Sequence, residues 1–430
     1  MNRPLKILNS NSLPNSFFEK AVESISETEK YFCYLSSHTD YIKEYPYLEF
    51  DKILAFGGKK IITPNENKWD NFSELIKTEN SWKFGFLSYD LKNELEDLSS
   101  LNSDEVKFPE LAFFIPNMVI AQKGNKVWFY GKNENQIDSF FSKVSAFKGG
   151  LKYSLNKTKF ESRTSKEDYL SRINVLKNEI QLGNIYEINY CIEFFAKNYN
   201  LNILSLFHHF VKESEVPFGA FCRFDDHYVF SGSPERFIKK QGLKIISQPI
   251  KGTSRRKEKS EFEAERAQLK NSLKDQTENV MIVDLVRNDL SKTAKRASVK
   301  VEELFGVYSF PTVHQLISTV VSEVDEKTNL ADIIKSCFPM GSMTGAPKIS
   351  AMQLAEKHED FKRGLYSGAI GFVTPKNNFD FNVVIRTAIF NSETNYLSYA
   401  VGGAITNLSN AEEEYQECLL KAERFLKLFQ

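Results

Sequence analysis

The segment LYSGAIGFVTPKNNFDFNVVIRTAIFNSETNYLSYAVGGAI, residues 365–405, decides the fold expected for this chain. It contains three runs rich in aromatic and β-branched residues, at 365–374, 379–390 and 396–405. The links between them, TPKNN and NSETN, are short and rich in turn-forming residues. Such runs are typical of strands, and short links join strands that run antiparallel. We therefore predict an antiparallel meander over this segment.

Further strands and two helices are expected around the meander. Strand-like runs occupy 227–233 and 243–252, and apolar residues recur at helical spacing over roughly 258–281 and 411–429. The expected apolar stripes are Leu269, Leu273 and Val280 on the first helix, and Tyr415, Leu419, Ala422, Leu426 and Phe429 on the second. Ser409 or Asn410 is expected to cap the second helix.

A polar, lysine-rich stretch at 151–169 marks a boundary in the chain. It ends in a helix-start signal at Thr164 or Ser165. We divide the chain there into an N-terminal region, 1–150, and a second region, 151–430. A hairpin turning at Gly124-Asn125 is expected in the first region. A length of 430 residues fits one large subdivided unit as well as two domains.

Composition excludes several classes of protein. Lys plus Arg number 56 and Asp plus Glu also number 56, so no overall field attracts nucleic acid or an anionic membrane. The five cysteines form no CxxC pair, and no run of eighteen apolar residues or signal-peptide pattern occurs. We expect a cytoplasmic protein that neither binds nucleic acid nor spans a membrane.

Carboxylates lie at helical spacing on both expected helices. Asp275 and Glu278 share a face of the first helix, and Glu414 and Glu417 share a face of the last, with Lys421 one turn further on. Carboxylates without nearby histidine favour magnesium, although a solvated acidic face is the better interpretation of either helix taken alone.

Anion-binding groups lie in the expected strands. Gly402 and Gly403 leave backbone N–H groups open to close approach by a carboxylate. Arg386 stands in an apolar run and needs either a structural carboxylate or a ligand carboxylate as its partner. The segment GSMTGAPK (341–348) lacks the adjacent Gly-Lys of a phosphate loop, so we reject nucleotide binding there.

Three further polar residues do not stand out alone. Lys251, in QPIKGTSRR (248–256), reads either as the solvated end of a strand or as a functional amine. His314 has the pattern of a packed histidine, and Glu235 that of an exposed turn residue.

Nine segments together resemble the chorismate-utilising enzymes, the family of anthranilate, aminodeoxychorismate, isochorismate and salicylate synthases. This resemblance implies an α+β fold, in which two large antiparallel β-sheets pack face to face with flanking helices outside. The matching segments are GNIYEINY (183–190), SPERF (233–237), PIKGT (249–253), ENVMIVDLVRNDL (278–290), VHQLIST (313–319), GSMTGAPK (341–348), RGLYSGAIGF (363–372), FNVVIRTAIF (381–390) and GGAITNLSNAEEEYQE (402–417).

The resemblance also implies an active site. Glu278 and Glu417 correspond to ligands of Mg²⁺, with Asp275 and Glu414 adjacent, and the metal would hold the ring carboxylate of chorismate. Glu235 corresponds to the general acid that protonates the departing 4-hydroxyl, which requires a raised pKa. The residues implied to contact the substrate are Thr253, His314, Thr344, Tyr366, Arg386, Gly402, Gly403 and Lys421.

Lys251 separates the activities within the family. PIKGT is similar to the aminodeoxychorismate synthases, in which the lysine adds to carbon 2 of chorismate before ammonia enters at carbon 4. This implies a transaminase-class amine transfer that gives 4-amino-4-deoxychorismate, the precursor of 4-aminobenzoate in folate synthesis. A depressed pKa of Lys251 is expected, from its apolar strand and from Arg255 and Arg256. Glu187 stands where amine-transferring members usually have glutamine and water-adding members have lysine.

Ammonia would come from solution or, as the family implies, from a separate glutamine amidotransferase subunit. Two alternatives remain: anthranilate synthase component I, and a catalytically silent regulatory partner that binds chorismate. Residues 33–53 faintly resemble the region where relatives hold tryptophan.

Overall fold

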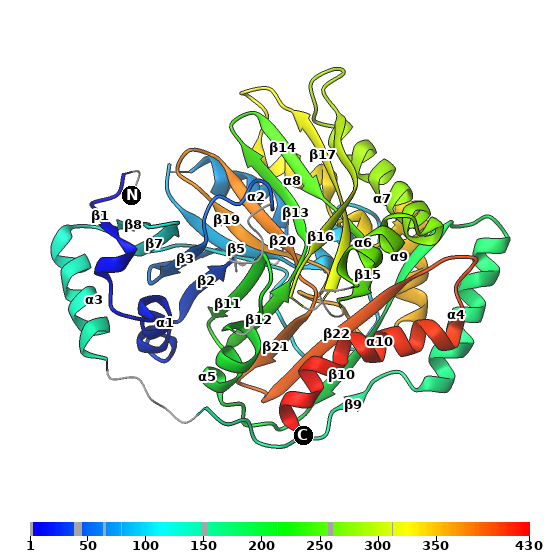
Figure 1. Cartoon of the computed structure of the whole chain (residues 1–430), viewed down its shortest axis with the longest axis horizontal. Helices are drawn as coiled ribbons and strands as arrows, with labels where there is room; N and C mark the ends of the chain where they lie inside the picture. Colours follow the sequence, from blue (N-terminus) through cyan, green and yellow to red (C-terminus); the bar gives the residue numbers. More distant parts are fainter. Residues whose placement is uncertain are drawn as a thin grey trace.

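Two large antiparallel sheets, with helices on their outer sides, form the body of the protein (Figure 1). The two-sheet α+β architecture expected from the sequence is therefore confirmed. The structure is a computed structural model. It describes residues 3–37, 45–62, 66–78, 80–147, 153–212, 214–256, 261–311 and 313–430, without the side chains of 59–62 and 255.

The first sheet has twelve strands. Strand β10 lies near one edge, where it pairs with β22, with β18 and with the short β9. In spatial order the strands are β1 (Lys6–Asn9), β8 (Lys126–Tyr130), β7 (Met118–Lys123), β3 (Lys52–Phe56), β2 (Tyr31–Ser36), β11 (Phe218–Phe224), β12 (His227–Ser233), β21 (Thr387–Asn391), β22 (Tyr396–Ile405), β10 (Glu187–Ala196) and β18 (Gly345–Ala346), with β9 (Glu161–Ser162) beside β10.

The second sheet has ten strands. Its order is β15 (Ile250–Arg255), β17 (Val313–Glu323), β14 (Lys244–Gln248), β13 (Arg236–Gln241), β20 (Phe379–Val383), β19 (Ala369–Val373), β5 (Lys83–Leu87), β6 (Leu111–Ile115) and β4 (Lys59–Ile62), with β16 (Lys300–Ser309) paired to β17.

The hydrophobic core fills the space between the sheets. Phe86 of the second sheet and Phe224 of the first meet edge to face, with ring centroids 4.7 Å apart. Both belong to one cluster that also takes side chains from β20, α7 and α8. A second cluster covers the outer side of the first sheet beneath α1, α3, α4 and α10. Each sheet is therefore buried on both faces over much of its area, which explains why its strands are nearly continuous apolar runs.

The helices and short helical turns lie outside the sheets. The α-helices are α1 (Phe17–Ser26), α2 (Lys68–Lys77), α3 (Glu134–Ala146), α4 (Lys166–Gln181), α5 (Ile203–Leu206), α6 (Phe262–Lys270), α7 (Leu273–Ser291), α8 (Leu330–Cys337), α9 (Lys348–His358) and α10 (Ala411–Leu426). The shorter turns are η1 (Ser10–Ser12), η2 (Tyr89–Glu94), η3 (Phe207–Lys212), η4 (Gly341–Met343) and η5 (Lys427–Phe429). Among the described helices, none combines the length and the apolar character needed to cross a bilayer.

The predicted meander over 365–405 is wrong, because the segment serves both sheets. Strands β19 and β20 form a hairpin in the second sheet, whereas β21 and β22 form a hairpin in the first. The chain changes sheets between Val383 and Thr387, where Arg386 adopts a positive φ of 51°. Arg386 thus lies at a corner rather than inside a strand. The apolar composition is unbroken across this corner, since both flanking strands are buried.

The single helix predicted over 258–281 is also wrong. Helix α6 ends at Lys270, and α7 begins after Ser272, whose side chain accepts a hydrogen bond from the Asp275 N–H. Because α7 begins as a new helix, its buried face is rotated relative to that of one continuous helix. Leu273 is therefore 79% exposed and Val280 is 47% exposed. The buried apolar residues of α7 are Ile282, Val283, Val286 and Leu290.

Local capping and turn predictions are confirmed. Ser165 caps α4, and Asn410 caps α10 by accepting hydrogen bonds from two backbone N–H groups. Strands β7 and β8 turn at Gly124, which has a φ of 53°. The division into 1–150 and 151–430 stays a prediction, and residues 148–152 around it lie outside the described residues.

Candidate active site

The side chains of Lys251 and Glu187 form an ion pair between the two sheets. Lys251 lies in β15 of the second sheet, and Glu187 is the first residue of β10 in the first sheet. The Lys251 Nζ is 2.6 Å from Glu187 Oε1, and the two residues are 9% and 1% exposed. Lys251 is therefore not the solvated end of a strand.

The expectation that Lys251 has a depressed pKa is wrong. Burial alone lowers its pKa, but the carboxylates of Glu187, Glu278 and Glu235 outweigh that effect and raise it above the ordinary value. The guanidinium of Arg256 donates to the Phe310 carbonyl and packs on the Phe262 ring, and it is not among the main causes of the shift. The side chain of Arg255 is outside the described part. Lys251 is thus held as a cation in the resting protein.

Glu235 is a buried acid beside this pair. It lies in the link between β12 and β13 and is 4% exposed, so it is not the exposed turn residue that its sequence pattern suggests. Burial raises its pKa to about 7, against the lowering effects of Ser342, Lys251 and a hydrogen bond from the Ile250 backbone. The raised pKa that a general acid requires is therefore present.

Carboxylates from α7 and α10 surround Lys274, a residue that the sequence analysis missed. Lys274 Nζ is 3.7 Å from Glu414 Oε1. Burial lowers the pKa of Lys274, but Glu414, Glu278, Glu417 and Asp275 raise it above its usual value. Its position one turn before Glu278 was the signal available in the sequence. The four predicted metal-site carboxylates therefore lie around one cation.

These carboxylates have some of the properties of a magnesium site. Burial raises the pKa of Glu278 to about 7, and its Oε1 is a buried acceptor without a hydrogen-bond donor in the described residues. Glu417 forms an ion pair of 2.7 Å with Lys421. Within the described ranges, no three His, Cys, Asp or Glu side chains are close enough to enclose a metal. The residues fit Mg²⁺ held by one or two carboxylates, with its other positions left to substrate and water.

The two glycines at the end of β22 differ in their surroundings. A Cβ placed on Gly402 would lie 2.6 Å from Cys191 Sγ and would collide with β10. A Cβ on Gly403 would lie 3.4 Å from Glu414 Oε2, so this glycine leaves room beside the acidic cluster. Lys421 donates to the Gly402 carbonyl at 2.7 Å and ties α10 to this turn. The two glycines and Lys421 thus lie side by side.

Arg386 reaches the same region from the corner between the sheets. Together with Lys421 and Lys274, it helps to lower the pKa of Glu417, against the raising effect of burial. No ion pair within 4 Å involves Arg386 among the described residues. A close structural carboxylate, one of the two partners considered for it, is therefore not found in that part of the chain.

The remaining predicted substrate contacts differ in their surroundings. Tyr366 is buried against Cys191, and the Thr344 hydroxyl donates to carbonyls of its own turn. Thr253 is exposed on β15. His314 faces α6, with Nδ1 2.9 Å from Ser309 Oγ, and no contact in the described ranges joins it to Lys251.

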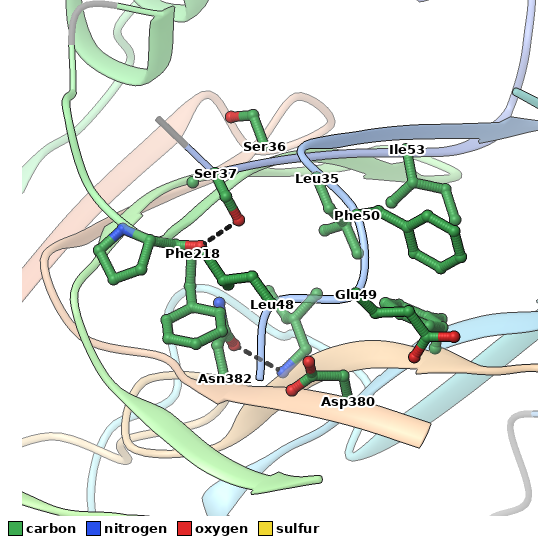
Figure 2. Close-up of a pocket in the computed structure, with 14 residues that line it drawn as sticks. Leu35, Ser36, Ser37, Leu48, Glu49, Phe50, Ile53, Phe218, Asp380 and Asn382 are labelled. Atoms are coloured by element: carbon green, nitrogen blue, oxygen red, sulfur yellow. Dashed lines mark hydrogen bonds between the residues drawn. The ribbon is translucent and has the colours of Figure 1, made fainter. Parts of the chain in front are cut away.

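A small cavity lies between the sheets (Figure 2). Its lining includes Phe50, Phe218 and Asp380, and it borders the 33–53 region. Its volume is about 50 Å³. Small-molecule pockets usually measure roughly 300–1,000 Å³, so this cavity is much smaller than a typical ligand site. The tryptophan hypothesis stays a prediction, and residues 38–44 at its centre lie outside the described residues.

Comparison with known proteins defines the class of this chain. A family model described as chorismate binding enzyme matches residues 30–427. The chain therefore belongs to the chorismate binding enzyme family.

Individual relatives come from two branches of that family. Aminodeoxychorismate synthase component 1 of Escherichia coli is 29% identical over 420 residues, which cover 91% of this chain and 92% of the relative. Anthranilate synthase component 1 of Saccharolobus solfataricus is 31% identical over 336 residues, covering 77% of each chain. The solved anthranilate synthase component I of Streptococcus pneumoniae matches 89% of this chain and 94% of its own, with a TM-score of 0.78 and 23% identity. That likeness establishes the fold.

Proposed function

We propose that this chain is component I of an aminodeoxychorismate synthase, which converts chorismate and ammonia to 4-amino-4-deoxychorismate for 4-aminobenzoate and folate synthesis. The observation that carries the proposal is the buried Lys251, set among Glu187, Glu235 and Glu278. An amine in that position can act as a nucleophile once it loses its proton. The similarity to the E. coli component 1 over nine-tenths of both chains supports the same assignment.

The proposed chemistry has two displacements. Lys251 Nζ forms a bond to ring carbon 2 while the bond from carbon 4 to its hydroxyl breaks. Glu235 gives its proton to the departing hydroxyl, which leaves as water. Ammonia then forms a bond to carbon 4 as the bond from carbon 2 to Nζ breaks, and the surplus proton of the new amine returns to Glu235.

Substrate binding is assigned to groups around this centre. Glu278 and Glu417, with Asp275 and Glu414 adjacent, would hold Mg²⁺, which supplies positive charge to a substrate carboxylate when bound. Arg386, with the backbone at Gly402 and Gly403, suits the second carboxylate, since a guanidinium can bind it through two hydrogen bonds. The further proposed contacts are Thr253, His314, Thr344, Tyr366 and Lys421. A separate glutamine amidotransferase subunit would supply ammonia.

Anthranilate synthase component I is the second candidate, and the 31% identity to the S. solfataricus protein favours it. Lys251 is the argument against it, because formation of anthranilate needs no lysine nucleophile at that position. A silent chorismate-binding partner would need neither the acid Glu235 nor the amine of Lys251.

The test is incubation of the protein with chorismate, Mg²⁺ and ammonium at mildly alkaline pH, followed by mass analysis. We expect 4-amino-4-deoxychorismate, and a covalent adduct on the Lys251 peptide after rapid quenching. Lys251→Ala should lose both. Lys240→Ala is the matched control, since Lys240 is 8% exposed in the same sheet and donates to the Asn377 carbonyl. Unchanged chorismate, isochorismate alone or anthranilate would contradict the proposal.

A further inference from the structure

We propose that Glu187 is the proton acceptor for Lys251: its carboxylate takes the proton that the lysine ammonium must lose before its nitrogen can attack chorismate. This inference rests on the proposed function, because it presumes that Lys251 is the nucleophile. It gives a role to a residue whose type the family resemblance leaves unexplained.

The geometry allows direct transfer. Nζ and Oε1 are 2.6 Å apart, a short charge-assisted hydrogen bond that needs no intervening water. The backbone of Glu187 is fixed by its neighbours, because β10 pairs with β18 at this point and Tyr186 N–H donates to the Ala346 carbonyl at 2.7 Å. Lys251 approaches from the other sheet. The donor and the acceptor are therefore held by two different sheets.

The second oxygen of Glu187 favours accepting a proton. Oε2 is buried and has no hydrogen-bond donor among the described residues. A buried carboxylate oxygen without a donor is unfavourable, whereas the carbonyl oxygen of a neutral carboxyl is much less so. A proton on Oε1 therefore turns a buried ion pair with one unsatisfied oxygen into a buried neutral pair.

The surroundings of Lys251 favour such an acceptor. Glu235, in the link before β13, and Glu278, on α7, face the pair, and Lys274 is the cation next to Glu278. The three carboxylates hold Lys251 in its protonated form, and burial limits exchange with water. The fastest route to a neutral amine is transfer of the proton to a group already in contact with Nζ, and Glu187 is in contact.

The proposed step is balanced within the pair. Lys251 –NH₃⁺ and Glu187 –COO⁻ become –NH₂ and –COOH, and the free electron pair on Nζ forms the bond to ring carbon 2. When ammonia displaces the lysine, Nζ leaves as a neutral amine and takes the proton back from Glu187. No proton is exchanged with solvent at this step.

A purely masking role for Glu187 makes the opposite prediction. If Glu187 only stabilises the lysine cation, Glu187→Gln should release a more readily deprotonated amine and speed its attack near neutral pH. If Glu187 accepts the proton, the same substitution should slow the attack, because the glutamine amide cannot take a proton.

The experiment measures the rate of the Lys251 adduct by rapid quenching and the rate of product formation, between pH 6 and about 9, in the wild type and Glu187→Gln. We expect Glu187→Gln to slow both by on the order of 100-fold near pH 7. The ratio of the variant rates to the wild-type rates should then rise about tenfold per pH unit, because solvent removes the lysine proton instead, while both proteins share the pH dependence of Glu235. Glu193→Gln is the control, because Glu193 is a 3% exposed glutamate of the same strand, paired with Arg163 at 2.7 Å.

The outcomes separate this inference from the function on which it rests. A wild type that forms neither adduct nor 4-amino-4-deoxychorismate overturns both. A normal wild type, with a Glu187→Gln variant that is as fast or faster near pH 7 or keeps the wild-type pH profile, overturns the inference alone. If Glu187→Gln does not fold, Glu187→Asp carries the same test, because it retracts the carboxylate from Nζ by one methylene.

Discussion

The buried acid Glu235 gives the sharpest prediction for the wild-type enzyme. Its pKa is raised to about 7, mainly by burial, so it is a neutral acid below pH 7 and a carboxylate above. If it must deliver a proton to the departing hydroxyl, kcat/KM for chorismate should fall as pH rises through 7. The acid form should make up about one-tenth of the protein at pH 8 and about one-hundredth at pH 9, and kcat/KM should fall in proportion.

The assay must separate this fall in kcat/KM from the change in free ammonia concentration with pH. Initial rates of 4-amino-4-deoxychorismate formation are measured at low chorismate, with the concentration of free ammonia held constant at each pH. Glu235→Gln should lower kcat/KM at pH 7 by roughly 10²–10⁴-fold and should remove the decline, because no titrating acid remains. Glu193→Gln, which alters another buried glutamate, should keep the wild-type decline.

Two results would refute this reasoning. One is a wild-type kcat/KM that stays flat between pH 7 and about 9, since a buried acid with this pKa cannot then be the proton donor. The other is a Glu235→Gln variant that retains the same decline in kcat/KM, because the decline would then come from the titration of a different group.

Three further predictions follow from the site and its scaffold. Glu278→Gln and Glu417→Gln should each abolish the Mg²⁺ dependence of activity, measured by titrating the metal into the apo protein; an unchanged metal response removes that residue from the site. Gly402→Ala should lower the free energy of unfolding by about 1–3 kcal/mol in urea denaturation, whereas Gly403→Ala should change it much less; equal effects would contradict the collision with β10. Asn410→Ala should cost about 1 kcal/mol through loss of the α10 cap, and an unchanged urea midpoint would show that the cap does not contribute.

Local signals in the sequence predicted local structure well. Strands β12 and β22 occupy the expected ranges, 227–233 and 396–405. Ser165 and Asn410 cap the helices that follow them. Each of these features is decided by a few neighbouring residues, since caps and alternating strands depend on short-range chemistry.

The errors arose where the structure depends on distant parts of the chain. The corner at Arg386 separates two buried strands of the same composition, so no local pattern marks it. The break between α6 and α7 at Ser272 could not be predicted, because polar and apolar residues continue through it at helical spacing. The same limit applies to the site. Glu187 and Lys251 are distant in sequence, and their contact reverses the pKa shift expected for the lysine.

The pairing of early with late strands has a consequence for biosynthesis. Phe32 of β2 is opposite Arg223 of β11, and Leu87 of β5 is opposite Ala369 of β19. The edge of a strand that is translated early therefore stays unpaired until its partner strand has been synthesised. Closing such long loops is slow, and open strand edges are templates for association between chains. We therefore expect the nascent protein to be prone to aggregate in the interval between synthesis of β5 and of β19.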